Sequence, residues 1–497
     1  MNPRILCRFL GFMLLLLGFS MSSCVVIDLF AMQHGDEHNF EGNLTSMVIT
    51  LAVGLVVSII GWPSRGQELL RKEAVAIVGL SWIVATLFGS LPYMLAEAPL
   101  SPVRSIFEAT SGFTTTGSTV ISNLEVYPRS ILFWRNLTQW VGGLGILALL
   151  VALMAALGVN RRSLLGHESS LNLQESPTAR IKGLVTRLWM VYCGLTLICW
   201  LGLLVVARLT GEWEMNAFNA FLYTMSTVAT GGFAPHDASV GHFGNVWIEA
   251  YLCVFMVLSS LSMIFVFHLV SGRAKEEAGR QEALVFVAVV CTAVVVTTLG
   301  LMAATDRSLG EAFREAFFPV VSISTTTGFA TADYDSWPLF GQGLLILLML
   351  IGGCSGSTSG GLKVIRVIVL FQILKQEVIR SFRPNLISAL KFGGHVIPSA
   401  FRVSILGFVS FNAILLLGSA LLVCALEPGM ADFTTTIGAV LATAMNIGPG
   451  FGDVGPTNNY AHLGEPTLLV LSGLMLLGRL EIYAVTALFT RSLWRHY

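Results

Sequence analysis

Charged side chains are scarce in this sequence. Only 12% of its 497 residues are Asp, Glu, Lys or Arg, whereas 54% are hydrophobic. A water-soluble fold of this length would lack the polar residues that must cover its surface. The composition therefore excludes a soluble globular protein and indicates one that has the lipid bilayer as its solvent. The formal net charge of zero gives no indication of a nucleic-acid partner.

Paired cysteines and catalytic constellations are also missing. The eight cysteines are scattered along apolar stretches with no Cys-x-x-Cys, so they indicate small hydrophobic residues and no disulfide or zinc framework. No Ser-His-Asp or paired-carboxylate arrangement fits within one membrane layer, which disfavours an intramembrane enzyme, and no organic cofactor is expected. His34 and His38 flank two acids, and a metal site there is conceivable, but a short polar loop needs no metal to explain it.

Long apolar stretches indicate ten membrane spans. A helix of about 20 apolar residues crosses the hydrocarbon core. Such stretches lie near 8–30, 45–63, 74–96, 131–157, 185–207, 245–270, 283–304, 340–374, 402–425 and 465–490. The first one begins like a secretory signal, but its apolar run continues to Phe30, so we expect a retained helix and not a cleaved leader.

Lys and Arg crowd into alternate loops, which predicts the orientation. The positive-inside rule places the loops rich in these residues, and with them both termini, in the cytoplasm. The opposite loops collect acids and hold only Arg104, Arg129, Arg208, Arg307 and Arg314. Arg135 and Glu249 lie closer to the outer interface, where we expect them to reach lipid headgroups, and neither is assigned a role.

Four short polar turns interrupt the apolar stretches. Each follows a short segment of helical character and precedes a long apolar segment. Irregular backbone at membrane depth is tolerated only where it is buried in protein or lines a water-filled path, so four such turns most economically share one path. Their carbonyl oxygens would then replace the hydration shell of a cation. The predicted cation-binding residues are Thr114, Thr115, Thr116, Gly117, Ala229, Thr230, Gly231, Gly232, Thr325, Thr326, Thr327, Gly328, Asn446, Ile447 and Gly448.

Glycine recurs at the same place in these turns. Successive carbonyls can point the same way only if the backbone visits positive φ, which glycine does at little steric cost. The preceding threonines can add hydroxyl ligands or brace the turn. In a single segment, glycine and threonine would more simply serve close helix packing, but four copies at the same place in a repeat favour a filter.

A run of weak helix formers occupies 352–361, inside the eighth span. Five glycines, three serines and a threonine in ten positions should unwind the helix, because each glycine costs about 1 kcal/mol relative to alanine. We expect a break beneath the filter that forms a gate, followed by a basic stretch from Lys363 to Lys391. The alternative is close packing of small residues. The candidate gating residues are Gly352, Gly353, Ser355, Gly356, Ser357, Thr358, Ser359, Gly360 and Gly361.

Arg479 lies near the middle of the last span among apolar residues, with Glu481 close in sequence. A charge at that depth costs at least about 2.5–3.5 kcal/mol on insertion scales, so it should face the pore or a partner. A pore-facing arginine would repel cations and influence gating. The alternative is an ion pair with a buried acid.

Together these motifs resemble the Trk/Ktr/HKT superfamily of potassium transporters, and its Trk-type membrane subunits in particular. The resemblance spans the chain and includes Gln139–Gly145, Gly352–Val364 and the closing Gly478–Glu481 segment. It implies K⁺ as the transported ion at the filter, a bacterial cytoplasmic (inner) membrane and a homodimer with one pore per protomer. It also implies a cytosolic ring of TrkA-type regulatory subunits that bind nucleotide, a gating loop at 352–361, and Arg479 pointing into the permeation path.

The fourth turn departs from the pattern of the resemblance. It reads Asn446-Ile447-Gly448-Pro449 where a Thr-Thr-Gly would be typical, so its side chains break the fourfold symmetry. In the related plant HKT proteins a serine in the first filter position accompanies sodium transport, so Gly117 implies potassium. No turn carries Thr-Val-Gly-Tyr-Gly, which predicts lower selectivity than that of a tetrameric potassium channel.

The fold class expected from these features is an all-α polytopic membrane protein. Four pseudo-symmetric repeats of helix, pore loop and helix surround one central pore, and two extra helices precede them. The expected units are 1–70 (two leading helices), 71–160, 161–271, 272–391 and 392–497 (the four repeats).

The leading function is low-affinity potassium uptake through a gated pore. A proton- or sodium-coupled potassium symporter on the same scaffold is the alternative, because the sequence does not show which acids reach the path. An intramembrane enzyme is the least favoured class, because the apolar spans offer no nucleophile or metal pair.

Overall fold

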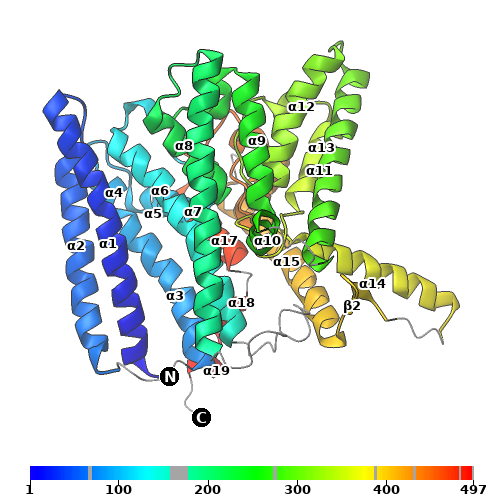
Figure 1. Cartoon of the computed structure of the whole chain (residues 1–497), viewed down its shortest axis with the longest axis horizontal. Coiled ribbons are helices and arrows are strands. Elements are labelled where there is room, and N and C mark those ends of the chain that lie inside the picture. Colours follow the sequence, from blue (N-terminus) through cyan, green and yellow to red (C-terminus); the bar gives the residue numbers. More distant parts are fainter. Residues whose placement is uncertain are drawn as a thin grey trace.

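The computed structural model describes residues 1–64, 70–156, 177–271, 277–384, 389–428, 432–480 and 483–494. It is almost entirely helical (Figure 1). The α-helices are α1 Pro3–His34, α2 Phe40–Gly61, α3 Arg71–Gly89, α4 Leu91–Met94, α5 Pro102–Phe113, α6 Arg129–Ala156, α7 Pro177–Thr210, α8 Ala217–Ala229, α9 Val246–Ser260, α10 Met263–Val270, α11 Glu277–Ala304, α12 Leu309–Ser324, α13 Leu339–Met349, α14 Val364–Phe382, α15 Ser399–Leu426, α16 Phe433–Ala444, α17 Glu465–Arg479, α18 Tyr483–Leu488 and α19 Arg491–Trp494.

Short elements fill some of the connections. Five 3-10 helices are η1 Trp62–Ser64, η2 Leu124–Val126, η3 Ser239–Phe243, η4 Tyr334–Ser336 and η5 Gly452–Val454. The strands β1 Lys391–Phe392 and β2 His395–Val396 form a small antiparallel hairpin after α14, with Lys391 opposite Val396.

Six helices of the described part are long and apolar enough to cross a membrane, and the bent pair α9–α10 makes a seventh if it is counted as one span. The six segments are Pro3–His34, Phe40–Ser64, Lys72–Met94, Val185–Thr210, Gly279–Ala304 and Ser399–Leu426. Each coincides with an expected span. Helix α6 occupies most of a seventh expected range, 131–157. The chain is thus a multi-pass membrane protein.

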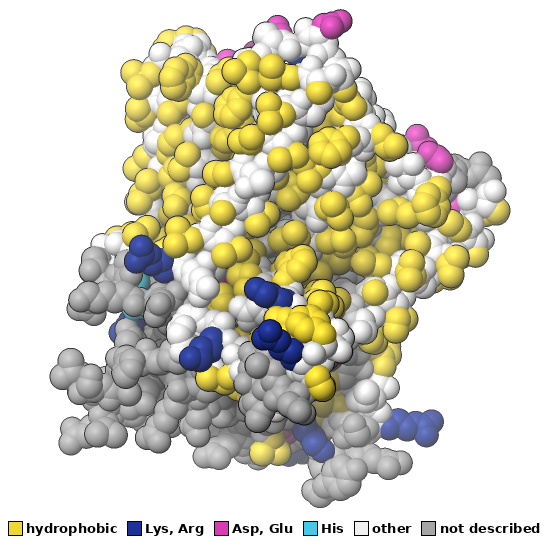
Figure 2. Space-filling view, turned by 90° about the vertical axis from the view of Figure 1, so that its right-hand side faces the viewer, with side chains coloured by type: hydrophobic (Ala, Val, Ile, Leu, Met, Phe, Trp, Pro, Cys, Tyr) yellow, Lys and Arg dark blue, Asp and Glu magenta, His cyan; other side chains and the backbone are white. Residues whose placement is uncertain are grey.

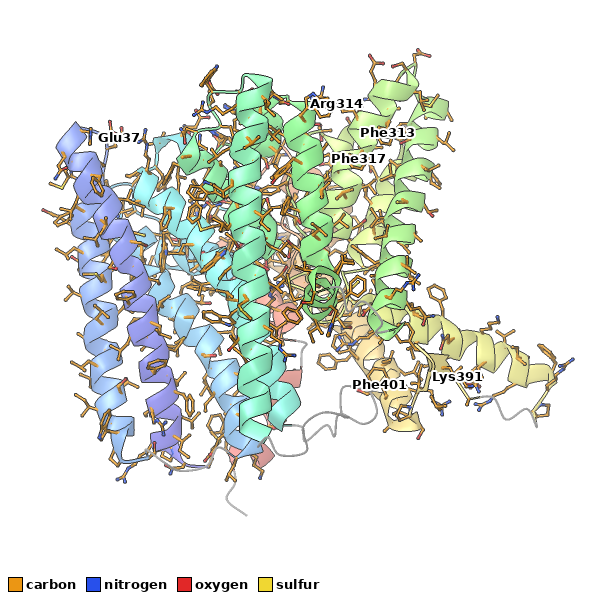
Figure 3. The ribbon with its side chains drawn as sticks, in the orientation of Figure 1. Glu37, Phe313, Arg314, Phe317, Lys391 and Phe401 are labelled. Carbon is orange, nitrogen blue, oxygen red and sulfur yellow. The ribbon has the colours of Figure 1, made fainter. Side chains whose placement is uncertain are left out.

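The charge distribution follows the long axis of the helices. A broad hydrophobic band covers the middle of the face in Figure 2, with acidic side chains above it and Lys and Arg below it. The N-terminus and the last described helix, α19, lie at the end that carries the basic side chains (Figure 1). Among the labelled side chains in Figure 3, Glu37 lies near the acidic end and Lys391 nearer the other, whereas Arg314 is a basic side chain near the acidic end.

The first two helices form a hairpin at one edge of the molecule (Figure 1). A polar cluster buried in this apolar hairpin joins it to the repeats. The side chain of Asp28 in α1 is 1% exposed and accepts hydrogen bonds from the Asn43 side chain (2.7 Å) and from the Asn39 amide (3.0 Å). Asn43 also donates to the Ser130 hydroxyl at the start of α6 (3.1 Å). Satisfied polar pairs of this kind fix helix register where hydrophobic contact alone is not directional.

Four short helices repeat along the chain: α5, α8, α12 and α16, of 12 to 16 residues each. At 1.5 Å per residue they are too short to cross a bilayer. Each lies between two helices of its repeat, as predicted: α3 and α6, α7 and α9, α11 and α13, α15 and α17. The unit boundaries stay a prediction, and those at residues 160 and 272 lie outside the described residues.

Three expected spans are interrupted. The apolar stretch 245–270 was expected as one helix, but α9 and α10 meet at an angle of 107°. The stretch 340–374 ends as a helix at Met349 and resumes at Val364, so the break predicted at 352–361 is present. In the last span, α17 ends at Arg479, and residues 481–482 lie outside the described part.

The first two interruptions are one structural feature. The irregular segment 351–363 lies against the bend, where the Cys354 amide donates to the Ser260 carbonyl (2.8 Å) and the Met263 amide donates to the Gly356 carbonyl (3.1 Å). Backbone groups freed by the bend are thereby satisfied by the broken helix of the next repeat. An uninterrupted apolar sequence could not reveal this bend, because its partners come from about 90 residues further along the chain.

Candidate functional site

The four polar turns share one unusual backbone conformation. A non-glycine residue occupies the left-handed region in each, with φ between 52° and 57°, and a glycine with φ between 80° and 106° follows two positions later. The pairs are Thr115 and Gly117, Thr230 and Gly232, Thr326 and Gly328, and Asn446 and Gly448. Among the described residues, only Ser239 is a further non-glycine with positive φ. The positive φ that the sequence predicted for the glycines is present in all four turns.

The turns also cap their short helices identically. In each, the amide after the left-handed residue reaches back five residues to a helix carbonyl, as in a Schellman cap. The bonds are Thr116 to Ser111 (2.8 Å), Gly231 to Ser226 (2.8 Å), Thr327 to Ser322 (2.9 Å) and Ile447 to Ala442 (2.9 Å). Carbonyls that would be orphaned at membrane depth are therefore satisfied.

The four turns contact one another in a closed ring. A Cβ built on Gly117 would meet the Gly231 carbonyl, one on Gly232 the Thr327 carbonyl, one on Gly328 the Ile447 carbonyl, and one on Gly448 the Thr116 carbonyl. Each of these approaches is closer than 3.0 Å, which real Cβ atoms do not tolerate. Glycine is thus required at each of the four positions by the backbone of the next repeat. All four glycines also line one small cavity of about 80 Å³.

Several of the threonine hydroxyls predicted as ligands or braces are engaged within the turns. Thr114 and Thr116 share a hydrogen bond of 2.7 Å, and Thr325 and Thr327 share one of 2.8 Å. The Asn446 side chain that breaks the pattern in the fourth turn makes a similar contact, because its Nδ2 donates to the Thr116 hydroxyl (2.9 Å). These hydroxyls brace the ring.

The broken helix lies directly against the turns. The Gly360 amide donates to the Thr326 hydroxyl (2.7 Å), and the hydroxyls of Thr230 and Thr358 are 3.4 Å apart. A Cβ on Gly360 would meet the backbone oxygen of Met445 in the fourth repeat. Segment 351–363 therefore touches three of the four turns, and its central Thr358 is fully buried.

This segment is held at its centre and near both ends. The Thr358 hydroxyl donates to the Val228 carbonyl (3.1 Å) in α8. A carboxylate oxygen of Glu282 in α11 accepts hydrogen bonds from the amides of Ser355 (2.8 Å) and Ile365 (3.2 Å), the latter in the first turn of α14. Glu282 therefore joins the first turn of α14 to the segment beneath the ring.

Arg479 binds the same segment. Its Nη1 donates to the Thr358 carbonyl at 2.7 Å, and its side chain is almost fully buried. Nε and Nη2 have no hydrogen-bond partner among the described residues. None of the described carboxylates pairs with Arg479, while Glu481 lies outside the described part. The structure thus brings Arg479 together with the predicted gating residues.

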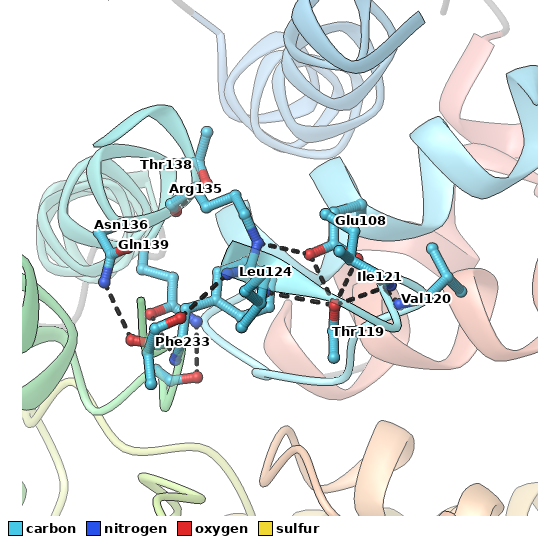
Figure 4. Close-up of polar contacts among 12 residues, drawn as sticks. Glu108, Thr119, Val120, Ile121, Leu124, Arg135, Asn136, Thr138, Gln139 and Phe233 are labelled. Carbon is cyan, nitrogen blue, oxygen red and sulfur yellow. Dashed lines mark hydrogen bonds and ion pairs between the residues drawn. The ribbon is translucent and has the colours of Figure 1, made fainter. Parts of the chain in front are cut away.

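Helix α6 braces the first two turns through a buried ion pair (Figure 4). Arg135 and Glu108 are at most 1% exposed, with Nε and Oε1 2.8 Å apart. The guanidinium also donates to the Ala234 carbonyl (3.1 Å) and lies 4.1 Å from the centre of the Phe233 ring. Glu108 in turn accepts from the Val120 amide (3.0 Å). The expectation that Arg135 reaches headgroups was wrong, because the ion pair satisfies its charge inside the protein.

Two further side chains of α6 complete the brace: Asn136, directly after Arg135, and Gln139, one turn further along (Figure 4). Gln139 donates to the Gly231 carbonyl (2.6 Å) and accepts from the Phe233 amide (3.1 Å). Asn136 donates to the Phe233 carbonyl (2.9 Å) and to the Ser226 hydroxyl (2.8 Å). The second turn is therefore held on both sides of Gly232 by side chains of the first repeat.

Glu249 was also expected at the lipid headgroups, and this expectation was wrong as well. Its side chain is 7% exposed and lies 2.8 Å from Arg314 of α12. Arg314 donates to the Gly244 carbonyl too (2.7 Å). The pair joins the second and third repeats near the acidic end of the molecule (Figure 3).

An acid outside the spans ties the third and fourth repeats together. Asp335 in η4 accepts a hydrogen bond from the Gly452 amide (3.2 Å). Burial raises the pKa of Asp335 from 3.8 to about 6, which outweighs the lowering by that hydrogen bond. The folded protein therefore holds a proton here more tightly than the unfolded chain does.

The comparisons with known proteins agree with this architecture. A family model described as TrkH, cation transport protein, matches residues 45–495. The chain belongs to the TrkH cation transport family.

Full-length relatives of the TrkH family support this assignment. The Trk system potassium uptake protein TrkH of Halomonas elongata is 36% identical over 504 residues, which cover 100% of both chains. TrkH of Escherichia coli strain K12 is 36% identical over 501 residues, again 100% of both, and TrkG of the same strain is 29% identical over 500 residues, 99% of both. The crystal structure of the potassium transporter TrkH from Vibrio parahaemolyticus superposes with a TM-score of 0.87 at 33% identity, covering 100% of both chains.

These matches confirm the superfamily and the fold class that the sequence predicted. They also confirm that this TrkH-family chain is not an enzyme, since the relatives are named as transport proteins. The sequence analysis did not predict the Glu108–Arg135 ion pair, although the sequence contains one indication of it. Both residues are charges placed inside apolar helices of one repeat, and such charges are paired as a rule.

We predict that Glu108→Gln destabilises this TrkH-family protein by about 3–5 kcal/mol, because it leaves the buried Arg135 charge without a counter-charge. The measurement is thermal unfolding of the purified protein in detergent. Glu377→Gln is the matched control, since Glu377 pairs with Arg380 at 2.8 Å on the exposed surface and should change stability by less than about 1 kcal/mol. Equal losses in the two variants would contradict the role of the buried pair.

We predict that Asp335→Asn removes a pH dependence of stability. The folded pKa of Asp335 is about 6 and its unfolded value 3.8, so its contribution becomes less favourable as the pH rises through this window. The melting temperature of the variant, relative to that of the parent, should therefore be higher at about pH 7 than at about pH 4. The exposed Asp306→Asn serves as control. A difference between variant and parent that is independent of pH would refute the prediction.

Proposed function

We propose that this chain mediates low-affinity potassium uptake through a gated pore. The observation that carries the proposal is the closed ring of four glycine turns around one cavity. Such a ring offers backbone oxygens from four sides, which suits an ion that has lost its water shell. The names of the relatives, which are potassium uptake proteins, support potassium as the ion. The filter residues are the fifteen of the four turns named from the sequence.

We further propose that segment 352–361 is the gate. It touches three turns and is joined through Glu282 to the first turn of α14. Helix α14 leaves the bundle sideways at the basic end (Figure 1). A cytosolic partner that pulls α14 could thus withdraw the segment from beneath the ring. This fits regulation by a TrkA-type subunit that binds nucleotide and docks on the basic stretch from Lys363 to Lys391.

The proposed setting is a bacterial cytoplasmic (inner) membrane with both termini in the cytoplasm. The basic end carries the N-terminus and α19, and cytoplasmic loops are enriched in Lys and Arg. The four turns would then be entered from the outside, where acidic side chains gather. A homodimer with one pore per protomer completes the proposal.

A proton- or sodium-coupled symporter remains the second candidate. Coupling needs a titratable group that contacts the moving part, and Glu282, 4% exposed, accepts two backbone amides of that part. Potassium flux into liposomes, with and without a proton or sodium gradient, separates the two functions. A pore conducts potassium down its own gradient alone, and a symporter requires the second gradient.

We predict that Gly117→Ser lowers selectivity for potassium over sodium. The new side chain would meet the Gly231 carbonyl and distort the ring. Gly211→Ser is the matched control, because Gly211 also has positive φ (76°) but no atom within 4 Å of its would-be Cβ. The measurement is the ratio of potassium to sodium permeability in reconstituted flux. Unchanged ratios in Gly117→Ser would refute the filter assignment at this position.

We predict that Arg479→Gln increases potassium flux, whereas Arg479→Lys leaves it close to that of the parent. At an effective dielectric constant near 20, two like charges several ångströms apart repel by roughly a few kcal/mol, so removing the charge favours cation occupancy. Lysine keeps the charge but loses the planar fork. Flux is compared at equal membrane abundance. Equal loss of abundance in both variants would show that Arg479 has a structural role only.

A further inference from the structure

Three potential metal ligands meet outside the ring of turns. The ligand atoms of Glu125, His236 and His242 all lie within 4.8 Å of one another. Glu125 belongs to η2, which follows the first turn, while His236 follows the second turn and His242 belongs to η3. Among the described residues, this is the one group of three His, Cys, Asp or Glu side chains whose ligand atoms lie so close together. The loop of His34 and His38 forms no such group there.

Packing places the two imidazole rings face to face. Their centroids are 4.0 Å apart and their planes differ by 3°, and the edge of Phe243 packs against both at 5.6 and 5.1 Å. Asp237 accepts a hydrogen bond from the Leu124 amide (2.9 Å), which holds η2 against the loop that carries His236. Nitrogens of two parallel stacked rings cannot both point at one ion, so metal binding requires His242, the more exposed ring, to turn out of the stack.

His236 has an unmet need for a partner. Its Nε2 is buried and has no hydrogen-bond partner in the described part of the chain, and buried polar atoms are normally satisfied.

The three side chains line an open cavity of about 630 Å³ together with a second acid. The carboxylate of Glu214 lies 3.0 Å from His242 Nε2, in position to orient that ring. Arg129 also lines the cavity, but it faces the carboxylate of Asp36 at 3.8 Å. The two glutamates give the cavity a field that favours cations.

We propose that Glu125, His236 and His242 bind a divalent transition-metal cation of the Zn²⁺ class, and that the bound cation slows ion entry. Two imidazoles and one carboxylate, with an open position for water, are a donor set that zinc prefers over magnesium or calcium.

The consequence for flux follows from position and rests on the proposed function. His236 lines the small cavity that the four glycines share. A divalent cation there adds positive charge beside the entrance, and it joins η2 of the first repeat to η3 of the second. Both effects oppose the entry of another cation.

Binding is tested by calorimetric titration of the full-length protein, freed of any histidine tag, with Zn²⁺ in detergent. The expected result is one ion per chain, with affinity at least about tenfold weaker in His236→Gln and in His242→Gln. His34→Gln is the matched control, since His34 is exposed on α1 and outside the group. Equal titrations of the parent and of the His236→Gln, His242→Gln double variant would overturn the site. This readout is independent of transport, so a failure of the proposed function leaves it valid.

The effect on flux is tested by adding Zn²⁺ to liposomes that contain the parent or a variant. Each flux is normalised to the same protein without zinc. Inhibition of the parent that a chelator reverses, and resistance of the double variant, are expected. Zinc binding with the expected stoichiometry but without any change in flux would overturn the inhibitory part of the proposal.

Discussion

The constraint on which this structure depends is that irregular backbone inside an apolar layer must have its polar groups satisfied within the protein. Each of the four turns meets it in the same way, with a left-handed residue that lets an amide reach back five residues to its own short helix. A left-handed residue other than glycine costs about 1–2 kcal/mol, and four copies are tolerated because every turn is also held by its neighbour. The ring and the caps therefore stabilise one another.

The backbone of the ring is fourfold, but its supports are not. The first two turns are held by side chains of α6, including the buried charge of Arg135. The fourth is held from outside by the hydroxyl of Tyr460, which donates to the Gly448 carbonyl (2.9 Å), and by Asp335 through the loop that follows. In the described part of the chain, the irregular segment 351–363 below the ring comes from the third repeat. Divergence of the repeats thus leaves the geometry of the turns intact and specialises what surrounds them.

Local features were readable from the sequence, and contacts between distant segments were not. The positive φ of Gly117 and its counterparts and the break at 352–361 follow from residue types alone. The 107° bend between α9 and α10 does not, because its satisfying partners lie in another repeat. The ion pair of Glu249 with Arg314 was missed for the same reason, whereas Glu108 and Arg135 belong to one repeat and are 27 residues apart. The outer group around His236 draws on segments separated by more than 100 residues, so no spacing in the sequence could indicate it.

Arg479 shows how one cation can serve both the fold and the path. Its single bond to the Thr358 carbonyl holds the segment that presses on three turns, so the arginine favours the position seen here. Its Nε and Nη2 are buried without a hydrogen-bond partner among the described residues. Such unsatisfied donors cost free energy unless water or an anion reaches them. Withdrawal of the segment would break the one bond and leave the whole guanidinium facing the opened space. In the proposed gate, an arginine held in this way would stabilise the blocked arrangement and, once released, would add positive charge to the path beneath the ring.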